Sequence, residues 1–277
     1  MGDWTKIDNA KGVAVPLCVF MPEGDAKACI LLLPALGVQA RFYRRLAEGL
    51  AGAGIGVCLL EQRGHGESPF RAGRGQSFGL QAFLDDDIPP AIEHARRLFP
   101  GSPFFLGGHS LGGHLSSITA GRRDDVTGVI HLACGFPYRG LFPKGQARQI
   151  KWLCRLLPTL TALVGYFPGE RLGFGGREYR QLMLDWRDWA MGGSYDGPAT
   201  PGAMDAIASY QGRVLSLAFE RDRLAPDKAV EFSRGCFKSA DLAARKLTDA
   251  EQGKHLGHFD WARKPDGVVR EIVSWID

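Results

Sequence analysis

Several features that would place the chain in a class at once are missing from its 277 residues. No stretch reaches about 18 consecutive apolar residues, which excludes a transmembrane helix. The first residues contain no apolar run of the kind that secretory signal peptides carry. Internal repeats and low-complexity tracts are lacking too, which excludes repeat architectures and gives no indication of disorder. The chain is therefore expected to be one large globular domain, or one domain with an insertion.

Strong charge and paired cysteines are also lacking. The 34 basic and 30 acidic residues leave a formal net charge of only +4, which is too small to indicate a nucleic-acid partner. No C-x-x-C pair occurs, so neither a zinc site nor a disulfide framework is expected, and the cysteines are interpreted as small buried hydrophobes in a reduced, cytoplasmic protein. The six are Cys18, Cys29, Cys58, Cys134, Cys154 and Cys236.

What the sequence does contain is a regular alternation of strand-like and helix-like segments. Strands are predicted at 13–20, 27–33, 55–60, near 104, 126–133, 213–219 and 241–247. Helices are predicted at 41–53, 80–99, 111–121, 227–236 and 265–276. This order predicts an α/β protein whose central sheet is mostly parallel and has helices on both faces. Reactive groups of such sheets gather at the carboxyl ends of the strands.

The alternation breaks between residues 135 and 212. This stretch holds three of the six tryptophans, many glycines and prolines, and helix-like pieces with no strand between them. We therefore expect a core made of residues 1–134 and 213–277, with residues 135–212 inserted between two core strands as a helical cap, or lid.

The most informative motif is Gly108-His109-Ser110-Leu111-Gly112, which lies between a predicted strand and a predicted helix. This is G-x-S-x-G in the context of a nucleophile elbow, where a sharp turn exposes a serine hydroxyl. Glycines on either side relieve the crowding that such a turn produces. A phosphate-binding loop would need a lysine after the last glycine, and none follows. Ser110 is therefore predicted to be a nucleophile.

A serine nucleophile needs a base and an acid, and the chain order Ser…Asp…His provides both. Asp222 lies just beyond the predicted strand at 213–219, with Glu220 as the rival acid. His258 lies in the loop before the last helix, with His255 as the rival base. Asp222 could alternatively be a solvated turn carboxylate, and either histidine a polar loop residue.

The remaining histidines are given other roles. His94 and His131 are expected to be surface or packed core residues, and His109 and His114 to support the turn around Ser110. Two backbone N–H groups should stabilise an oxyanion. Leu111 follows the nucleophile and is predicted to supply one. Leu36 is predicted to supply the other, from the loop Pro34-Ala35-Leu36-Gly37, since proline has no N–H to donate.

These motifs together resemble the α/β-hydrolase superfamily, in its serine-hydrolase branch of esterases, monoacylglycerol-type lipases and related peptidases. The stretch from Glu61 to Ser68 resembles the family pattern Asp-x-Arg-Gly-x-Gly-x-Ser, and Gly257-His258-Phe259 matches Gly-His-Phe. Asp222 falls where the family has its acid, although Phe219 replaces a usual glycine. The resemblance implies the α/β-hydrolase fold over nearly the whole core.

One departure concerns the oxyanion loop, which usually reads His-Gly-x-Gly in the family. Here it reads Pro34-Ala35-Leu36-Gly37, which keeps a backbone donor but loses the histidine and the first glycine. This loop and Gly165-Tyr166-Phe167-Pro168-Gly169 also resemble a bacterial group of α/β hydrolases with undefined substrate. The resemblance therefore implies a chemistry without naming a substrate.

The first half of the expected cap has an unusual charge pattern. No acidic residue occurs from 135 to 169, while Lys144, Arg148, Lys151 and Arg155 recur on one face of a predicted helix. The simpler interpretation is an amphipathic lid helix with its basic face in water. The alternative is a weak patch for an anionic lipid surface or an acidic substrate. Apolar and aromatic residues of the cap suggest an acyl pocket, or equally a core for the cap itself.

The sequence thus predicts a serine hydrolase without cofactor or metal that cleaves a small carboxylic ester with an apolar acyl group. Ser110, His258 and Asp222 form its triad, and the N–H groups of Leu36 and Leu111 its oxyanion hole. Amide, peptide or C–C bond hydrolysis by the same triad remains an alternative, as does a non-catalytic binding protein on this scaffold. Haloalkane dehalogenation is disfavoured because it needs a carboxylate in place of Ser110.

Overall fold

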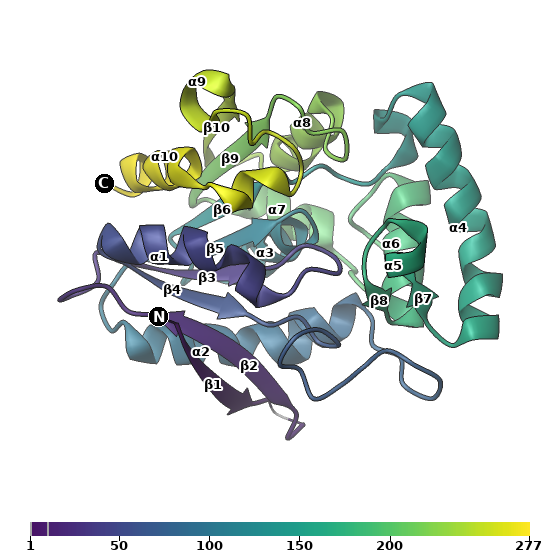
Figure 1. The fold of residues 1–277 in the computed structure, drawn as a ribbon, viewed down its shortest axis with the longest axis horizontal. Coiled ribbons are helices and arrows are strands. Elements are labelled where there is room, and N and C mark those ends of the chain that lie inside the picture. The colour runs from purple at the N-terminus through teal and green to yellow at the C-terminus, as the bar shows by residue number, and fades with distance from the viewer. Residues whose placement is uncertain (1, 10) are drawn as a thin grey trace.

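The computed structural model describes residues 2–9 and 11–277. A single sheet with strand order β1-β2-β4-β3-β5-β6-β9-β10 runs through the molecule (Figure 1). Its strands are β1 (Asp3–Asp8), β2 (Ala14–Phe20), β3 (Ala28–Leu33), β4 (Ile55–Leu60), β5 (Phe104–His109), β6 (Gly128–Leu132), β9 (Arg213–Phe219) and β10 (Asp241–Leu247). The pairs β1–β2 and β2–β4 are antiparallel, and every further pair, from β4–β3 to β9–β10, is parallel. The predicted mostly parallel sheet is confirmed.

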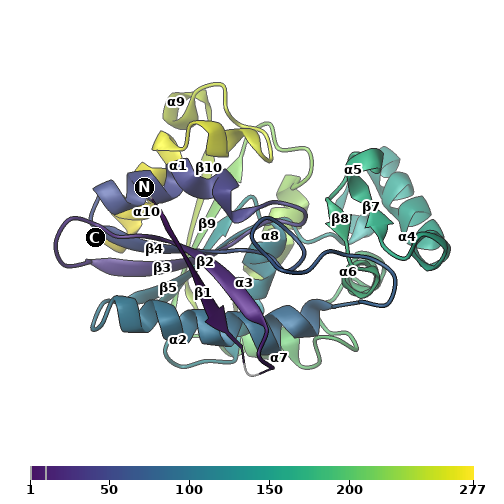
Figure 2. The ribbon, with the colours of Figure 1, turned by 60° about the horizontal axis from the view of Figure 1, so that its bottom comes forward.

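Helices cover both faces of this sheet, as predicted (Figure 2). One face carries α1 and α10, and the other carries α2, α3 and α7. Their bounds are α1 (Arg44–Gly52), α2 (Ile88–Leu98), α3 (Leu111–Gly121), α7 (Ala203–Ser209), α8 (Asp227–Gly235), α9 (Asp249–Gln252) and α10 (Asp266–Ile276), with 3-10 turns at Ala40–Tyr43 and Asp260–Arg263. None of the helices in the described part of the chain has the length and apolarity needed to cross a bilayer.

Burial on both faces explains why the central strands are apolar throughout. All six residues of β3 are buried. Successive side chains of a strand point to opposite faces. Accordingly Ile30 and Leu32 pack in the cluster that includes α1 and α10, whereas Leu31 and Leu33 pack in the cluster that includes α2 and α3. Such continuous apolar runs are typical of parallel strands between two helical layers.

Residues 135–212, all of them described, connect β6 to β9 and add no strand to the large sheet. They form η3 (Arg139–Leu141), α4 (Lys144–Val164), β7 (Phe167–Pro168), α5 (Gly169–Leu172), β8 (Arg177–Glu178), α6 (Arg180–Gly192) and α7. We call them the 135–212 segment. α4 and α6 stand together at one end of the sheet, whereas α7 packs against α3 on its face (Figure 2). The short antiparallel pair β7–β8 differs from the strand-free interpretation, because two-residue strands leave no period in a sequence.

Two other elements differ from expectation. The edge strand β1 was not foreseen, because most of its residues are exposed and polar and so carry no apolar pattern. The helix predicted at 80–99 begins with a π-helical turn, Ala82–Asp87, before α2. Pro89 and Pro90 stand at the start of α2 and have no N–H groups, so they cannot continue the hydrogen bonds of a preceding α-helix.

The connections of β3 and β5 leave the sheet on opposite faces, which positions the site. The chain leaves β3 toward α1 and leaves β5 toward α3, and these helices lie on different faces. Because β3 and β5 are neighbours, with Leu33 paired to Gly108, a crevice forms beyond their carboxyl ends. Ser110 and the loop that begins at Pro34 both enter this crevice.

Candidate active site

The turn between β5 and α3 holds Ser110 in a strained conformation. Its φ of 51° and ψ of −113° lie outside the regions that a side chain favours. The Ser110 N–H donates to the Leu132 carbonyl at 3.0 Å, and its own carbonyl accepts the N–H of Gly113 at 2.9 Å. Strain of this kind persists only where the surroundings impose it, and it is typical of functional sites.

The surroundings that impose it are the two glycines of the motif. A Cβ on Gly108 would lie 2.0 Å from the backbone of Gly112, and a Cβ on Gly112 would lie 2.1 Å from the carbonyl oxygen of Leu33. Both contacts are with backbone and cannot be relieved by rotating a side chain. The turn can therefore close only when both positions are glycine.

The predicted acid and base lie against each other. Asp222 follows β9, and its Oδ1 accepts the N–H groups of Leu224 at 2.8 Å and Ala225 at 2.9 Å. Its Oδ2 lies 2.8 Å from Nδ1 of His258, and both side chains are buried. With Asp222 ionised, the Nδ1–H of His258 donates to it, which leaves Nε2 free to accept a proton.

Neither rival takes part in this pair. Glu220 is exposed, and its N–H donates to the Leu247 carbonyl. His255 is half-buried and does not line the cavity described below. Ser110 and His258 line that cavity together. The hydrogen bonds of the described residues include none between Ser110 Oγ and His258 Nε2, so that contact stays a prediction, and such contacts often tighten only with substrate.

The loop after β3 lines the same cavity as Ser110 with Ala35 and Leu36. Pro34 has none, and the Ala35 N–H is taken up by the Tyr43 hydroxyl at 2.9 Å. The first N–H left in the loop is that of Leu36, which lines the cavity as Leu111 does. That the N–H groups of Leu36 and Leu111 stabilise an oxyanion stays a prediction.

Residues that sequence reasoning missed hold this loop in place. The Tyr43 hydroxyl, having accepted the Ala35 N–H, lies 2.9 Å from Nδ1 of His109 and can donate to it. The His109 ring packs in turn against that of His258, with 4.8 Å between centroids. A buried chain of contacts thus joins the loop to the base. Tyr43 lies in the helix predicted at 41–53, and nothing in a helical pattern marks its hydroxyl as a partner of this loop.

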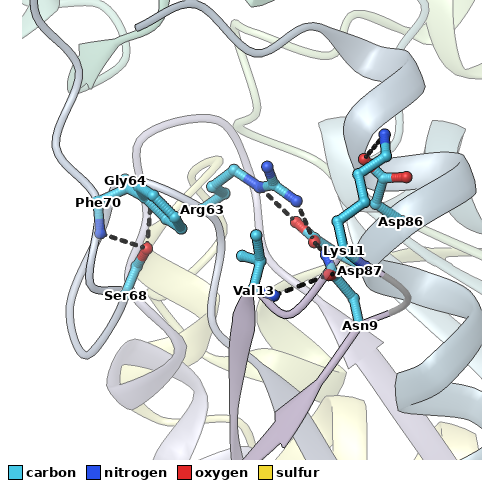
Figure 3. A network of polar contacts seen from close by, with 9 residues as sticks. All are labelled: Asn9, Lys11, Val13, Arg63, Gly64, Ser68, Phe70, Asp86 and Asp87. Carbon is cyan, nitrogen blue, oxygen red and sulfur yellow. Dashed lines mark hydrogen bonds and ion pairs between the residues drawn. The ribbon is translucent and has the colours of Figure 1, made fainter.

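A second set of contacts comes from the Glu61–Ser68 stretch. Burial raises the pKa of Glu61, whose carboxylate accepts the Ala40 N–H at 2.9 Å just beyond the 34–37 loop. Further along, Arg63 forms a buried ion pair with Asp87, which also accepts a hydrogen bond from Asn9 (Figure 3). The family-like stretch therefore holds the chain at Ala40, next to the 34–37 loop, and at Asp87, at the start of α2.

The 135–212 segment touches the same loop from above. A Cβ on Gly37 would lie 2.2 Å from the backbone nitrogen of Gly176, so the two loops are in close contact. Nε2 of His65 lies 3.1 Å from Glu178 of β8. Burial acts to lower the pKa of His65, but the hydrogen bond and charge of Glu178 outweigh it and raise that pKa. This buried pair ties the segment to the core.

Three more histidines are buried in the core near the site. The ring of His114 lies 2.7 Å from the Tyr195 hydroxyl, and that of His131 lies 2.7 Å from Ser117 Oγ. Burial lowers the pKa of His114 to about 3 and of His131 to about 4, and it lowers that of His109 well below its ordinary range. These three are neutral packing residues, which leaves His258 as the histidine paired with a carboxylate beside Ser110.

A cavity of about 570 Å³ opens over Ser110 between the sheet and the 135–212 segment. Its apolar walls are Leu36, Leu111, Phe142, Ile150, Leu153, Phe167, Leu172, Phe174, Trp186, Leu224 and Phe259. Ser110, His114, Gln146, Gln149 and His258 supply its polar side chains. Among the described residues that line it, none is acidic, lysine or arginine. An uncharged, largely apolar ligand suits such a wall.

Comparison with known families matches residues 24–187 to the family model described as serine aminopeptidase, S33. Among curated proteins, human monoglyceride lipase is 29% identical over 123 residues and the mouse enzyme 30% over 121. Each match covers 44% of this chain and only 39% of the lipase. The chain thus matches about two fifths of the length of these relatives.

Solved structures resemble the whole chain. A thermostable carboxyl esterase from Bacillus coagulans, in complex with glycerol, has a TM-score of 0.71 at 13% identity and covers 99% of this chain and 97% of its own. A haloalkane dehalogenase from Bradyrhizobium elkani has a TM-score of 0.69 at 16% identity, with 100% and 98% covered. At such identities the likeness concerns the fold, and the predicted α/β-hydrolase fold is confirmed.

Proposed function

This chain belongs to the serine aminopeptidase S33 family of α/β hydrolases, and we propose that it is a serine hydrolase that cleaves a carboxylic ester with an apolar acyl group. The observation that carries the proposal is an uncharged, mostly apolar cavity over Ser110, with His258 on its wall and the buried Asp222 bonded to His258 behind it. Similarity to monoglyceride lipases over part of the chain supports ester hydrolysis in general.

In the proposed acylation step, Ser110 Oγ attacks the ester carbonyl carbon and its proton passes to His258 Nε2. The carbonyl oxygen becomes an oxyanion, which the N–H groups of Leu36 and Leu111 stabilise. Such preorganised donors are each worth about 3 kcal/mol in the transition state. The carbon–oxygen bond to the alcohol then breaks, the alcohol takes the proton from His258, and the acyl group stays on Ser110.

Deacylation repeats the sequence with water as nucleophile. His258 removes a proton from water, the hydroxide attacks the acyl carbon, and the carboxylic acid leaves as Ser110 regains its proton. Asp222 holds the imidazole in the tautomer that has Nε2 free and stabilises the imidazolium that forms in both steps. The three hydrogen bonds to Asp222 support this role, because they fix both of its oxygens.

An ester is favoured over the N-terminus of a peptide by the charge of the cavity. An aminopeptidase must bind an α-ammonium group, and a buried cation without a partner costs several kcal/mol. The described residues that line the cavity offer no carboxylate to balance it. Family membership therefore supports hydrolysis in general, while the wall of the cavity favours a neutral ester.

We further propose that the 135–212 segment is the cap over this site, with residues 1–134 and 213–277 as the core. Its side chains Phe142, Ile150 and Trp186 among the cavity walls support this role. A cytoplasmic location is proposed as well, because the six cysteines are buried as free thiols, as expected in a reducing compartment.

A substrate panel tests the proposed function. The purified protein is assayed with p-nitrophenyl butyrate and with leucine p-nitroanilide, which releases the same kind of chromophore from an amide with a free amino group. We expect the ester to be cleaved at least about a hundredfold faster in kcat/KM, from the cost of an unpaired ammonium. The Ser110→Ala variant supplies the background. Faster cleavage of the anilide would overturn the ester assignment.

A further inference from the structure

The outer face of α4 exposes large apolar side chains to water. Trp152, Leu156 and Leu163 are 54%, 60% and 69% exposed. Their spacing, i, i+4 and i+11, places them along one stripe of the helix. The buried residues of α4, Cys154, Leu157 and Thr161, lie elsewhere on the helix and form its contact with the rest of the protein. The exposed stripe is therefore not needed to hold α4 in place.

This stripe continues toward the mouth of the cavity. On α4 it borders Gln149 and Leu153, which line the cavity. Leu172, Leu224 and Phe259 also line the cavity and are 54%, 44% and 40% exposed, so they form its rim. Of the nine large hydrophobic side chains exposed in the described residues, three lie on α4 and three on this rim. Apolar surface is thus concentrated around the entrance to the site.

A basic stripe runs beside the apolar one on α4. It consists of Lys144, Arg148, Lys151 and Arg155, all exposed. Among the ion pairs of residues 2–9 and 11–277, none involves these four side chains. The guanidinium of Arg155 lies over the Trp152 ring, 5.6 Å from its centroid, so the two stripes meet. No acidic residue occurs from 135 to 169 to offset this charge.

We propose that the outer face of α4 docks on an anionic lipid surface, with the helix lying in the plane of the headgroups. The apolar stripe enters the boundary between headgroups and acyl chains, and the basic stripe reaches the lipid phosphates. The charge of the face argues against a second copy of the chain as its occupant, because two such faces would set four cations against four. This binding goes beyond the proposed function and does not depend on hydrolysis.

Docking in this orientation has a consequence for the site. The apolar rim of the cavity is then near the lipid surface, so an apolar ester can pass from lipid to cavity without crossing water. Transfer of each methylene through water would cost about 0.8 kcal/mol. The apolar wall of the cavity and the apolar face of α4 would thus serve the same passage of substrate.

Sedimentation with vesicles tests the docking directly. The full chain is mixed with vesicles of phosphatidylcholine alone, or with about one third phosphatidylserine, at low and high salt. We expect binding to the anionic vesicles that weakens as salt is raised, because surface charge is screened. The Ser110→Ala variant is expected to bind as the unaltered protein does, which separates docking from catalysis.

Two pairs of variants locate the surface. Arg148→Gln with Lys151→Gln is expected to lower binding about thirtyfold, from about 1 kcal/mol for each basic group converted at 1.4 kcal/mol per factor of ten. Its control, Lys228→Gln with Lys238→Gln, removes the same charge from exposed positions near α8. Trp152→Ala is expected to lower binding about tenfold or more. Its control is Trp4→Ala, which removes an exposed tryptophan from β1.

Three results would overturn the proposal. One is equal sedimentation with neutral and anionic vesicles, or none with either. Another is binding that falls as much in the Lys228/Lys238 and Trp4 controls as in the α4 variants, which would indicate general charge or hydrophobicity. The third is a dimer in analytical ultracentrifugation that Trp152→Ala dissociates, since the face would then be a contact between copies.

Discussion

The turn around Ser110 and the helix α4 of the 135–212 segment differ in how closely they are packed. At the nucleophile turn, the space beside Gly108 and Gly112 is occupied by backbone about 2 Å away, whereas nothing lies within 4 Å of a Cβ on Gly145 in α4. The same contrast holds for large apolar side chains, which are buried in the central strands β3, β4 and β5 but exposed along the outer face of α4. The core geometry is imposed from all sides, while α4 packs on one side only. We therefore assign the chemistry to the core and the choice of substrate and surface to the segment.

The largest expected effect lies in the core. Ser110→Ala and His258→Ala are each expected to lower kcat for p-nitrophenyl butyrate by about 10⁴-fold or more, and the double variant by little more than either, because the groups act as one unit. Steady-state kinetics measure both. His255→Ala is the matched control and should keep near-full activity. A reversal, with His255 essential and His258 dispensable, would show that the base is misassigned.

The glycine contrast itself is tested by stability. Gly112→Ala should lower the free energy of unfolding by about 3 kcal/mol or more, because its Cβ meets the Leu33 carbonyl. Gly145→Ala should be neutral, or stabilise α4 by up to about 1 kcal/mol. Urea denaturation measures both variants. Similar losses in the two would mean that α4 is held as tightly as the turn.

The contribution of the segment to substrate choice is tested by acyl chain length. From acetate to butyrate, kcat/KM should rise about fourfold per carbon, since each buried methylene is worth about 0.8 kcal/mol. Leu153→Trp fills the cavity from α4 and should stop this rise at a shorter chain. Leu156→Trp, on the exposed side of the same helix, should leave the profile unchanged. A flat or falling profile in the unaltered protein would contradict an apolar acyl site.

Inside the core, Tyr43 is expected to position the oxyanion loop. Tyr43→Phe leaves the buried Ala35 N–H without its acceptor, which costs about 1–3 kcal/mol. We expect kcat to fall about tenfold with KM little changed, because the oxyanion forms only after substrate has bound. The split between kcat and KM is the readout. If the loss appeared in KM alone, the tyrosine would act on binding and not on the loop.

The smallest expected effect is the pH dependence of the stability that the His65–Glu178 pair gives to the contact between the core and the 135–212 segment. The pKa of His65 is raised when folded, so its pair with Glu178 stabilises the fold below the ordinary value of 6.5 and loses this contribution as pH rises through the raised pKa. The pKa values of His114 and His131 are lowered when the protein is folded, so these two histidines have the opposite effect on stability. Their contribution is present above pH 6.5 and is lost as the pH falls toward about 3 for His114 and about 4 for His131.

The difference in unfolding free energy between the unaltered protein and His65→Gln separates the contribution of the His65–Glu178 pair from that of the buried histidines of the core. We expect this difference to be larger at pH 6 than at alkaline pH. Denaturation at a series of pH values measures it. A difference that stays constant, or that grows with pH, would show that the pair is not a source of pH-dependent stability.

The parts predictable from sequence are those in which local pattern and fold agree. The apolar runs of β3 and β4 predict buried parallel strands. The glycines on either side of Ser110 predict a sharp turn, because only glycine fits beside the backbone there. The predicted Asp222 and His258, which lie 36 residues apart, were paired by chain order alone, and the structure brings them within 2.8 Å.

What could not be predicted depends on contacts distant in sequence. The Tyr43 hydroxyl and the His65–Glu178 pair bridge separate elements, and neither side of such a bridge has a pattern of its own. The strands β1, β7 and β8 are too exposed or too short to leave a period. The exposure of one face of α4 likewise depends on how the helix packs. Its sequence pattern is compatible with an apolar stripe that is buried against the protein and equally with one that is exposed to water.

The central claim, that Ser110 is an activated nucleophile, is tested most directly by covalent labelling. The native protein is treated with a fluorophosphonate probe, digested and mapped by mass spectrometry. We predict one phosphonate on Ser110, with labelling strongly slowed in His258→Ala and abolished in Ser110→Ala. An unlabelled protein, or a label on another residue that persists in Ser110→Ala, would contradict it.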